Sequence, residues 1–280
     1  MGISVGDGAV RSAQEMERQF VLALGGFALE IPGATLVTHE RIAVPRFNFA
    51  QEVVVGRERI AAFFERALDH YFQRALRPSF RVPLPVPKFL ESALEQLGFR
   101  PSGSPLTLLL AANPLETGPV GELTIRSATA DELDAVVSFW SAPNERDELR
   151  RAIDVAWHHP NPEESLIPWL AFQEEEPVSA SLVYRYRRST GIFAVSTRTE
   201  ERGKGAATAL VGEILRASGH PSEASIAIWS ESPRLEHRLE RLGFAAARRY
   251  AVFTLPADAE LSIPPPGPPT PPRWRPPRRR

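Results

Sequence analysis

The feature that most constrains this chain is an internal repeat at a fixed spacing of 145 residues. The segment FLESALEQLGF (89–99) matches RLEHRLERLGF (234–244) at seven of eleven positions. Each copy has the spacing of an amphipathic helix, ends at a Gly that suits a left-handed C-terminal cap, and runs into an apolar segment. The apolar segments, PLTLLL (105–110) and RYAVFTL (249–255), have the character of strands. A repeat of this kind predicts two copies of one structural unit.

The same spacing aligns further segments of the two halves without a gap. Residues 47–53 (FNFAQEV) fall on residues 192–198, and residues 57–64 (RERIAAFF) fall on residues 202–209. A strand, a helix, a second strand, a second helix and a third strand thus share one offset. This pattern predicts a duplication, and a length of 280 residues suits two domains of roughly 100–150 residues each.

The two copies meet at AANPLETGPVG (111–121), where Pro, Gly and polar residues interrupt two apolar strands. We therefore expect a first, truncated domain at 15–112, a linker at 113–121 and a complete domain at 122–256. Only about 46 residues precede the strand at 47–53, so we expect the first copy to lack opening elements.

Both ends of the chain are expected to be disordered, over residues 1–14 and 257–280. The C-terminal segment is mostly Pro and Arg, which can form neither helices nor sheet ladders, so a polyproline-like tail is predicted. Such a tail could bind a proline-recognising domain or an anionic surface, or it could have no function. The net charge of the chain is −1, and five Arg against Asp258 and Glu260 give this tail +3, so the rest carries −4. A folded body with that balance is not expected to bind nucleic acid.

Composition narrows the classes of protein to which this chain could belong. No apolar run approaches the roughly 20 residues of a membrane span, and no signal peptide is read at the start, so we expect a cytoplasmic protein that does not enter a membrane. The chain has no Cys, which excludes disulfides, thiol nucleophiles and thiolate ligands. The six His show no metal-binding spacing, and we expect no metal.

Residues 122–256 read as an ordered series of elements. The predicted order is strand, two helices, three strands, helix, strand, helix and strand, which indicates an α/β (α+β) fold with a mixed sheet and helices on its faces. The predicted segments are 122–128, 130–140, 144–157, 166–173, 178–187, 191–198, 202–218, 224–230, 234–244 and 249–255.

The chemically informative segment is the junction of a strand and a helix at residues 199–208 (TEERGKGAAT). The first N–H groups of a helix lack partners and carry partial positive charge, so they favour a phosphate. Gly203 and Gly205 leave room for a pyrophosphate to approach the backbone, while Arg202, Lys204 and the Thr208 hydroxyl add charge and a donor. Neither the GxxxxGK[ST] loop nor the dinucleotide-binding fingerprint is present.

The second half resembles the GNAT superfamily of N-acetyltransferases over residues 122–256. The family motif is Arg or Gln, any two residues, Gly, any one residue, then Gly or Ala, and RGKGAA (202–207) satisfies it. The resemblance implies tandem GNAT-like domains, the first of them degenerate, with acetyl-CoA as co-substrate and no metal. The residues that it implies for cofactor binding are Val195, Ser196 and Thr197 through their backbone, Arg202, Gly203, Lys204, Gly205, Ala206, Ala207 and Thr208 at the pyrophosphate, and Ser232.

The chain departs from the family at the residues that move protons. Leu239 stands where many members have a Tyr that protonates the departing thiolate, and Ala227 stands where some members have a Glu base. Ser232 replaces an Asn that often touches the cofactor. No catalytic residue is therefore assigned; weak candidates for the missing acid are Tyr184, Tyr250 and His237.

The first copy makes a poorer site at the matching segment. There RERIAA (57–62) places Glu58 and Ile60 where the second copy has glycines, and a carboxylate would repel a pyrophosphate. We expect one acetyl-CoA site per chain and a first copy that packs against, or shapes, the acceptor cleft.

Three functions follow. The first is an enzyme that transfers acetyl from acetyl-CoA to a primary amine of a small molecule or peptide by direct attack in a ternary complex. The second is a catalytically inactive acyl-CoA-binding sensor or scaffold, and the third is an adaptor that uses its Pro/Arg tail.

Overall fold

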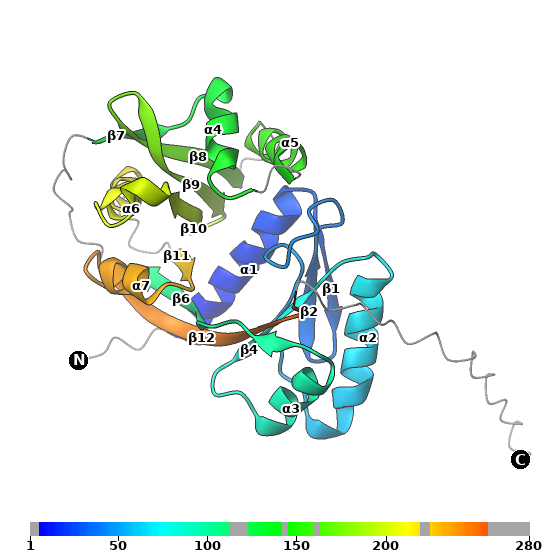
Figure 1. Ribbon diagram of the computed structural model, residues 1–280. Coiled ribbons are helices and arrows are strands. Elements are labelled where there is room, and N and C mark those ends of the chain that lie inside the picture. Colours follow the sequence, from blue (N-terminus) through cyan, green and yellow to red (C-terminus); the bar gives the residue numbers. More distant parts are fainter. Residues whose placement is uncertain (1–5, 112–122, 142–144, 159–162, 219–224, 257–280) are drawn as a thin grey trace, which may run out of the picture.

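The computed structural model of this chain forms one large sheet with helices on both faces (Figure 1). The described residues are 6–111, 123–141, 145–158, 163–218 and 225–256. The linker at 113–121, the tail at 257–280 and residues 1–5 lie outside them, so the expectations for those segments stay predictions.

The sheet has 12 strands in the order β1-β2-β3-β4-β12-β6-β11-β10-β9-β8-β7, and β5 pairs with β12 beside this path. It is mixed, because β3 runs parallel to β4 and β10 runs parallel to β11 while the other neighbours are antiparallel. The strands are β1 (Phe27–Ile31), β2 (Ala34–Thr38), β3 (Phe49–Gln51), β4 (Ser79–Pro83), β5 (Arg100–Pro101), β6 (Leu106–Ala111), β7 (Leu123–Ser127), β8 (Glu164–Gln173), β9 (Glu176–Tyr186), β10 (Ser189–Thr197), β11 (Ser225–Ser230) and β12 (Phe244–Thr254).

Helices cover the two faces differently. Successive residues of a strand point to opposite faces, and Leu108 of β6 packs in the core with α1, α4 and α5, whereas Leu109 packs with α6 and α7. In the N-terminal half, α2 and α3 cover the face that α6 and α7 cover in the C-terminal half. The helices are α1 (Asp7–Ala23), α2 (Ile60–Phe72), α3 (Lys88–Gln96), α4 (Leu133–Ser138), α5 (Arg146–Trp157), α6 (Ala206–Ala217) and α7 (Pro233–Glu240).

The predicted order of elements in the second half is confirmed, from β7 through α4, α5, β8, β9, β10, α6, β11 and α7 to β12. In the first half, the repeat offset carries β3, α2, β4, α3 and β6 onto β10, α6, β11, α7 and β12. The first half opens with α1, β1 and β2 alone, whereas β7, α4, α5, β8 and β9 precede β10. One strand and one helix at the start of the second half thus have no counterpart in the first half.

The two halves exchange their last strands. β12, which ends the second half, pairs with β4 of the first half, and β6, which ends the first half, pairs with β11 of the second. β6 and β12 also pair with each other at the centre of the sheet. The division that we predicted at 113–121 therefore does not separate two sheets, because each half is completed by a strand of the other.

The expectation that residues 1–14 are disordered is wrong for residues 7–14. Helix α1 begins at Asp7, and Val10, Ala13 and Gln14 are buried. In Figure 1 this helix runs between the two halves, and it packs against β9, β10 and β11 on one side and β1 and β2 on the other. Its burial depends on these distant partners. Among the described residues, no helix is both long enough and apolar enough to cross a bilayer.

Candidate functional site

The end of β10 carries a bulge at the centre of the predicted site. Phe193 pairs with Leu182 of β9 and Ser196 pairs with Ala180, so β10 has one more residue than β9 over this stretch. Ala194, inside the bulge, has a φ of 54°, a left-handed conformation that is uncommon for a residue with a side chain. Bulges of this kind re-aim backbone groups at active sites.

Two hydroxyl groups of β9 hold the bulge in place. Ser181 Oγ donates to the carbonyl of Phe193 at 3.0 Å, and Ser179 Oγ donates to the carbonyl of Ser196 at 2.6 Å. Ser196 Oγ in turn donates to the carbonyl of Phe139 at 3.1 Å, which fixes the end of β10 to the segment after α4. Hydrogen bonds to β9 and to the segment after α4 thus hold the bulge in place.

Beyond the bulge, β10 and β11 diverge. The last parallel pair joins Ile192 to Ile228, although β10 continues to Thr197. Val195 and Glu231 each lie three residues past that pair, on opposite sides of the opening. The β10 backbone on this side has no strand partner and is available to a ligand.

The loop that was predicted to hold a pyrophosphate turns on two glycines directly before a helix. Gly203 and Gly205 have φ values of 90° and 101°, which L side chains rarely adopt. Helix α6 begins directly afterwards at Ala206, and Ala209 N–H donates to the carbonyl of Gly205 at 2.9 Å. The N–H groups that come before Ala209 in this first turn have no intrahelical acceptor, so they can receive an anion.

Three cations surround the loop. Lys204 forms an ion pair with Glu201 at 2.9 Å, and Arg202 Nε donates to the carbonyl of Thr197 at 3.3 Å. Arg238 of α7, which we did not predict, donates to the carbonyl of Gly203 at 3.4 Å. Its only signal in the sequence is its place beside Leu239.

Thr208 stands in the first turn of α6, close to the two glycines of the loop. Its Oγ1 is buried and has no hydrogen-bond partner among the residues that the structure describes. Buried hydroxyls without partners are rare in native proteins. A phosphate oxygen at the start of α6 would satisfy this hydroxyl.

A cavity of about 520 Å³ extends from the opening between β10 and β11 across the α1 face of the sheet. Ala194, Val195 and Ser196 line one end, and Arg81 of β4 lines the other. The structure thus brings the strand residues predicted from the sequence to the wall of a cavity. The aromatic residues of that wall are Phe20, Phe47, Phe49, Trp140, Phe193 and Trp229.

Three of these aromatic rings form a continuous stack. The Phe193 ring lies 4.1 Å from Phe20 of α1 and 5.2 Å from Trp229 of β11, centroid to centroid, and is nearly parallel to both. The stack joins an N-terminal helix to the C-terminal half. The first half therefore contributes directly to the cavity wall.

Two carboxylates line the cavity, and they differ in whether they form an ion pair. Glu17 of α1 forms a buried ion pair with Arg81 at 2.5 Å. Glu231 follows β11 on the same side of the strand as Trp229, and no hydrogen bond or ion pair holds its carboxylate within the described part of the chain. Glu231 was missed from the sequence because the family pattern directs attention to position 227.

Leu239, Ala227 and Ser232 stand where the family has residues for proton transfer or cofactor contact, and in this fold they pack in the core or cap a helix. Leu239 and Ala227 are fully buried in the core. Ser232 caps α7, since its Oγ accepts from Leu235 N–H at 3.3 Å.

None of the three candidate acids lines the cavity. Tyr250 is buried on the other flank of α1, where its hydroxyl donates to Glu52 at 2.8 Å. Burial raises the pKa of Tyr250, and the neighbouring Glu52 raises it further. His237 is exposed on α7 and faces Glu240.

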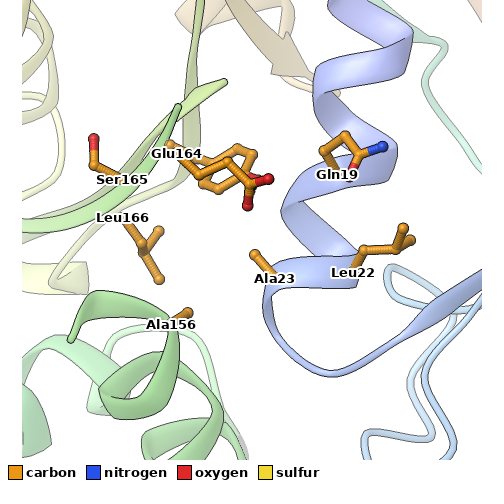
Figure 2. A pocket seen from close by; sticks show the side chains of 8 residues that line it. Gln19, Leu22, Ala23, Ala156, Glu164, Ser165 and Leu166 are labelled. Carbon is orange, nitrogen blue, oxygen red and sulfur yellow. Dashed lines mark hydrogen bonds between the residues drawn. The ribbon is translucent and has the colours of Figure 1, made fainter. Parts of the chain in front are cut away.

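Tyr184 lines a separate, smaller cavity of about 330 Å³ between α1, α5 and β8 (Figure 2). Its hydroxyl donates to Glu164 at 3.0 Å, and burial together with Glu164 raises the pKa of Tyr184. Figure 2 shows Glu164 pointing toward α1, where Gln19 and Ala23 lie. Tyr184 is thus engaged in a partly buried hydrogen bond away from the bulge.

The matching loop of the first half already carries its own anion. The Glu58 carboxylate lies against Gly56, where it occupies the space that a Cβ would fill. A hydrogen bond from its own backbone N–H lowers the pKa of Glu58. A carboxylate therefore occupies the start of this helical segment, as the sequence indicated. The described residues contain no cluster of three or more potential metal ligands.

The chain matches no protein-family model, and no curated protein matches it in sequence. Solved structures do match its fold. A GCN5-related N-acetyltransferase from Kribbella flavida superposes with a TM-score of 0.61 at 15% identity, covering 91% of this chain and 96% of that one.

Two further solved structures match the fold of this chain. A GCN5-related N-acetyltransferase from Sphaerobacter thermophilus gives a TM-score of 0.55 at 14% identity, covering 79% of this chain and 76% of that chain. A tandem GNAT protein from the clavulanic acid biosynthesis pathway gives 0.50 at 11% identity, covering 76% of each chain. The chain therefore has the fold of the GCN5-related N-acetyltransferases, the GNAT fold.

Proposed function

We propose that this protein is an acyl-CoA-dependent N-acyltransferase that moves an acetyl group from acetyl-CoA to a primary amine. One observation carries the proposal. The opening between β10 and β11 joins a helix N-terminus that suits a pyrophosphate to a cavity lined by aromatic residues that suits an acceptor. We further propose that the transfer is direct and takes place in a ternary complex at one site per chain.

The residues present fit acetyl-CoA. The start of α6, with Gly203 and Gly205 in left-handed conformations, would hold the pyrophosphate together with Arg202, Lys204 and Arg238. The orphaned hydroxyl of Thr208 gains a partner in that arrangement. The backbone of Val195, Ser196 and Thr197 would bond the amides of the pantetheine arm. Bound there, acetyl-CoA supplies an activated acyl carbon for attack by an amine.

The chain's own groups then position the amine and remove its proton. Backbone N–H groups at the bulge can donate to the acyl oxygen as negative charge develops on it, and their fixed position makes them effective. Glu231 lines the same cavity at an exposed position, and its carboxylate has no partner among the described residues. We assign it to accept the proton that the attacking amine releases, directly or through one water.

Protonation of the departing thiolate has no assigned side chain. The position of the family's Tyr is occupied by Leu239, which is fully buried. A general acid contributes typically about 10²–10⁴-fold, while positioning of two reactants contributes much of the remaining acceleration. Transfer without that acid is therefore slower but feasible.

The test is a thiol-release assay with acetyl-CoA against a panel of primary amines, including amino sugars, diamines and short peptides. We expect release with at least one amine and a drop of about 10²-fold or more in kcat for Glu231→Gln. Glu240→Gln is the matched control, because Glu240 is exposed on α7 outside the cavity. Tight acetyl-CoA binding without release for any amine would favour the sensor or scaffold instead.

A further inference from the structure

The far end of the cavity is marked by a buried cation. Arg81 of β4 is nine-tenths buried and lines the cavity. Its guanidinium lies 3.5 Å from the centroid of the Phe49 ring, and Nη1 donates to Glu17 Oε1 at 2.5 Å. Stacking on an aromatic face and a short ion pair hold the planar group in one orientation.

Arg81 keeps unused N–H donors in this ion pair. Glu17 uses Oε1 for Arg81 and Oε2 for the amide of Gln51, at 3.1 Å. A guanidinium has five N–H donors, and the structure gives Arg81 one hydrogen bond to a side chain. A ligand that reaches this end of the cavity therefore meets spare N–H donors of Arg81, and these favour a carboxylate on the ligand.

The near end of the cavity has an unsatisfied donor as well. Trp140 lines the cavity, and its indole Nε1 is buried without a hydrogen-bond partner. Its neighbour Phe139 is tied to Ser196 of β10. A carbonyl oxygen of a ligand at this end would give the indole N–H the acceptor that it lacks within the described residues.

The spacing of the two ends defines the length of the ligand. β4 is the third strand from β11 and the fourth from β10 in the sheet, so the opening between β10 and β11 lies roughly 14–19 Å from β4 at ordinary strand spacing. The Arg81 side chain occupies part of that distance. A primary amine at the bulge and a group that binds Arg81 are therefore separated by roughly 10 Å, which two to three residues of extended peptide span.

We propose that the acceptor of the transfer proposed above is an elongated primary amine that carries a carboxylate roughly 10 Å from the amine, as a tripeptide does. Arg81 binds the carboxylate, and Trp140 donates to a carbonyl close to the amine. The aromatic stack of Phe20, Phe193 and Trp229 lies along the apolar body between them. This proposal rests on the proposed function and specifies its acceptor.

The test compares one tripeptide, alanyl-phenylalanyl-alanine, with its C-terminal amide, which keeps the amine and the length but lacks the carboxylate charge. In the thiol-release assay we expect the free acid to have a KM lower by about 10- to 100-fold, at similar kcat. Calorimetric titration of both peptides into the protein alone provides a readout that does not need turnover. Equal KM values and equal affinities for the two peptides would overturn the proposal.

Variants assign the effect to a residue. Arg81→Gln should raise the KM of the free acid to that of the amide, while the dissociation constant of acetyl-CoA and the KM of the amide stay the same. Arg46→Gln, at a second cation on the cavity wall, should leave the preference for the acid in place. A preference that survives in folded Arg81→Gln, or that disappears only in Arg46→Gln, contradicts the role of Arg81.

Folding and function can be separated in the same experiment. Arg81→Gln leaves the Glu17 charge buried alone, which destabilises a protein strongly, so the double variant Glu17→Gln/Arg81→Gln serves where the single variant does not fold. The double variant should likewise show no preference for the acid. Lack of acetyl-CoA binding and of thiol release with every amine would defeat the proposed function, whereas release without a preference for the acid would defeat only this inference.

Discussion

Ser179 Oγ of β9 donates a 2.6 Å hydrogen bond to the carbonyl oxygen of Ser196 on β10. This bond holds the last residues of β10 against β9 at the point where the strand leaves β11. Ser179 Oγ also lies 3.1 Å from Thr197 Oγ1, so a single hydroxyl orders two consecutive residues of the proposed pantetheine-binding segment. The shape of the opening thus depends on a small polar group in the neighbouring strand.

Ser179→Ala should therefore impair transfer more than folding. The lost bond leaves a partly buried carbonyl without its partner, at a cost of about 1–3 kcal/mol in the free energy of unfolding. Misplacement of the β10 backbone should lower kcat/KM by about 10- to 100-fold. Thermal melting and thiol release measure the two effects. Ser138→Ala on the exposed face of α4 is the control, and equal kinetic losses in both variants would contradict the role of Ser179.

Leu239→Ala should act through packing alone. Leu239 is fully buried in the core that α6 and α7 share, so its truncation should lower the free energy of unfolding by about 2–5 kcal/mol. Turnover per folded molecule should change little at a temperature where the variant is folded. A loss of turnover with unchanged stability would contradict this, because it would give an aliphatic side chain a chemical role.

Tyr250→Phe and Tyr184→Phe should leave the pH profile of kcat unchanged. Both hydroxyls are engaged with carboxylates, Glu52 and Glu164, and neither residue lines the cavity at the bulge. Removal of either hydroxyl should cost about 1 kcal/mol of stability through the lost hydrogen bond. A basic limb of the profile that disappears in one variant would identify that Tyr as the general acid after all.

The stability of the protein should depend on Glu132 in acid. Hydrogen bonds from Arg126 and from Thr129 lower the pKa of Glu132 to about 2, from an ordinary value of 4.5. A lowered pKa in the folded state means that the contribution of Glu132 is complete above pH 4.5 and is lost as the pH falls toward 2. We expect Glu132→Gln to lower the melting temperature at pH 7 and to melt close to wild type near pH 2. An equal deficit at both pH values would contradict this.

Local patterns predicted where β10 ends and α6 begins. The loop at 199–208 and the α7-to-β12 junction are set by short-range rules, since left-handed glycines and helix starts are specified by neighbouring residues. Helix α1 was missed for a physical reason. Its buried residues include Gln14 and Glu17, whose partners Tyr250, Gln51 and Arg81 lie 34 to 236 positions away. Without those partners the segment reads as a polar, unfolded end.

The strand exchange and the cavity could not be read from the repeat. β6 and β12 have the same apolar character, so either could pair with β4 or β11, and the pattern does not distinguish the two arrangements. The cavity wall combines α1, β4, β10 and β11, which no local motif links. Arg238 was missed because it matters only through its contact with Gly203, which the fold brings near it.

The most direct test is calorimetric titration of acetyl-CoA into wild type, Ala207→Glu and Glu58→Gln. Ala207 lies in the first turn of α6, where a carboxylate suits the helix dipole but repels a pyrophosphate, so the protein should stay folded and lose affinity by roughly 30-fold or more. Glu58→Gln alters the matching segment of the first half and should bind as wild type does, with one site per chain. Two equivalent sites in wild type, or undiminished binding by folded Ala207→Glu, would show that acetyl-CoA is not held at the start of α6.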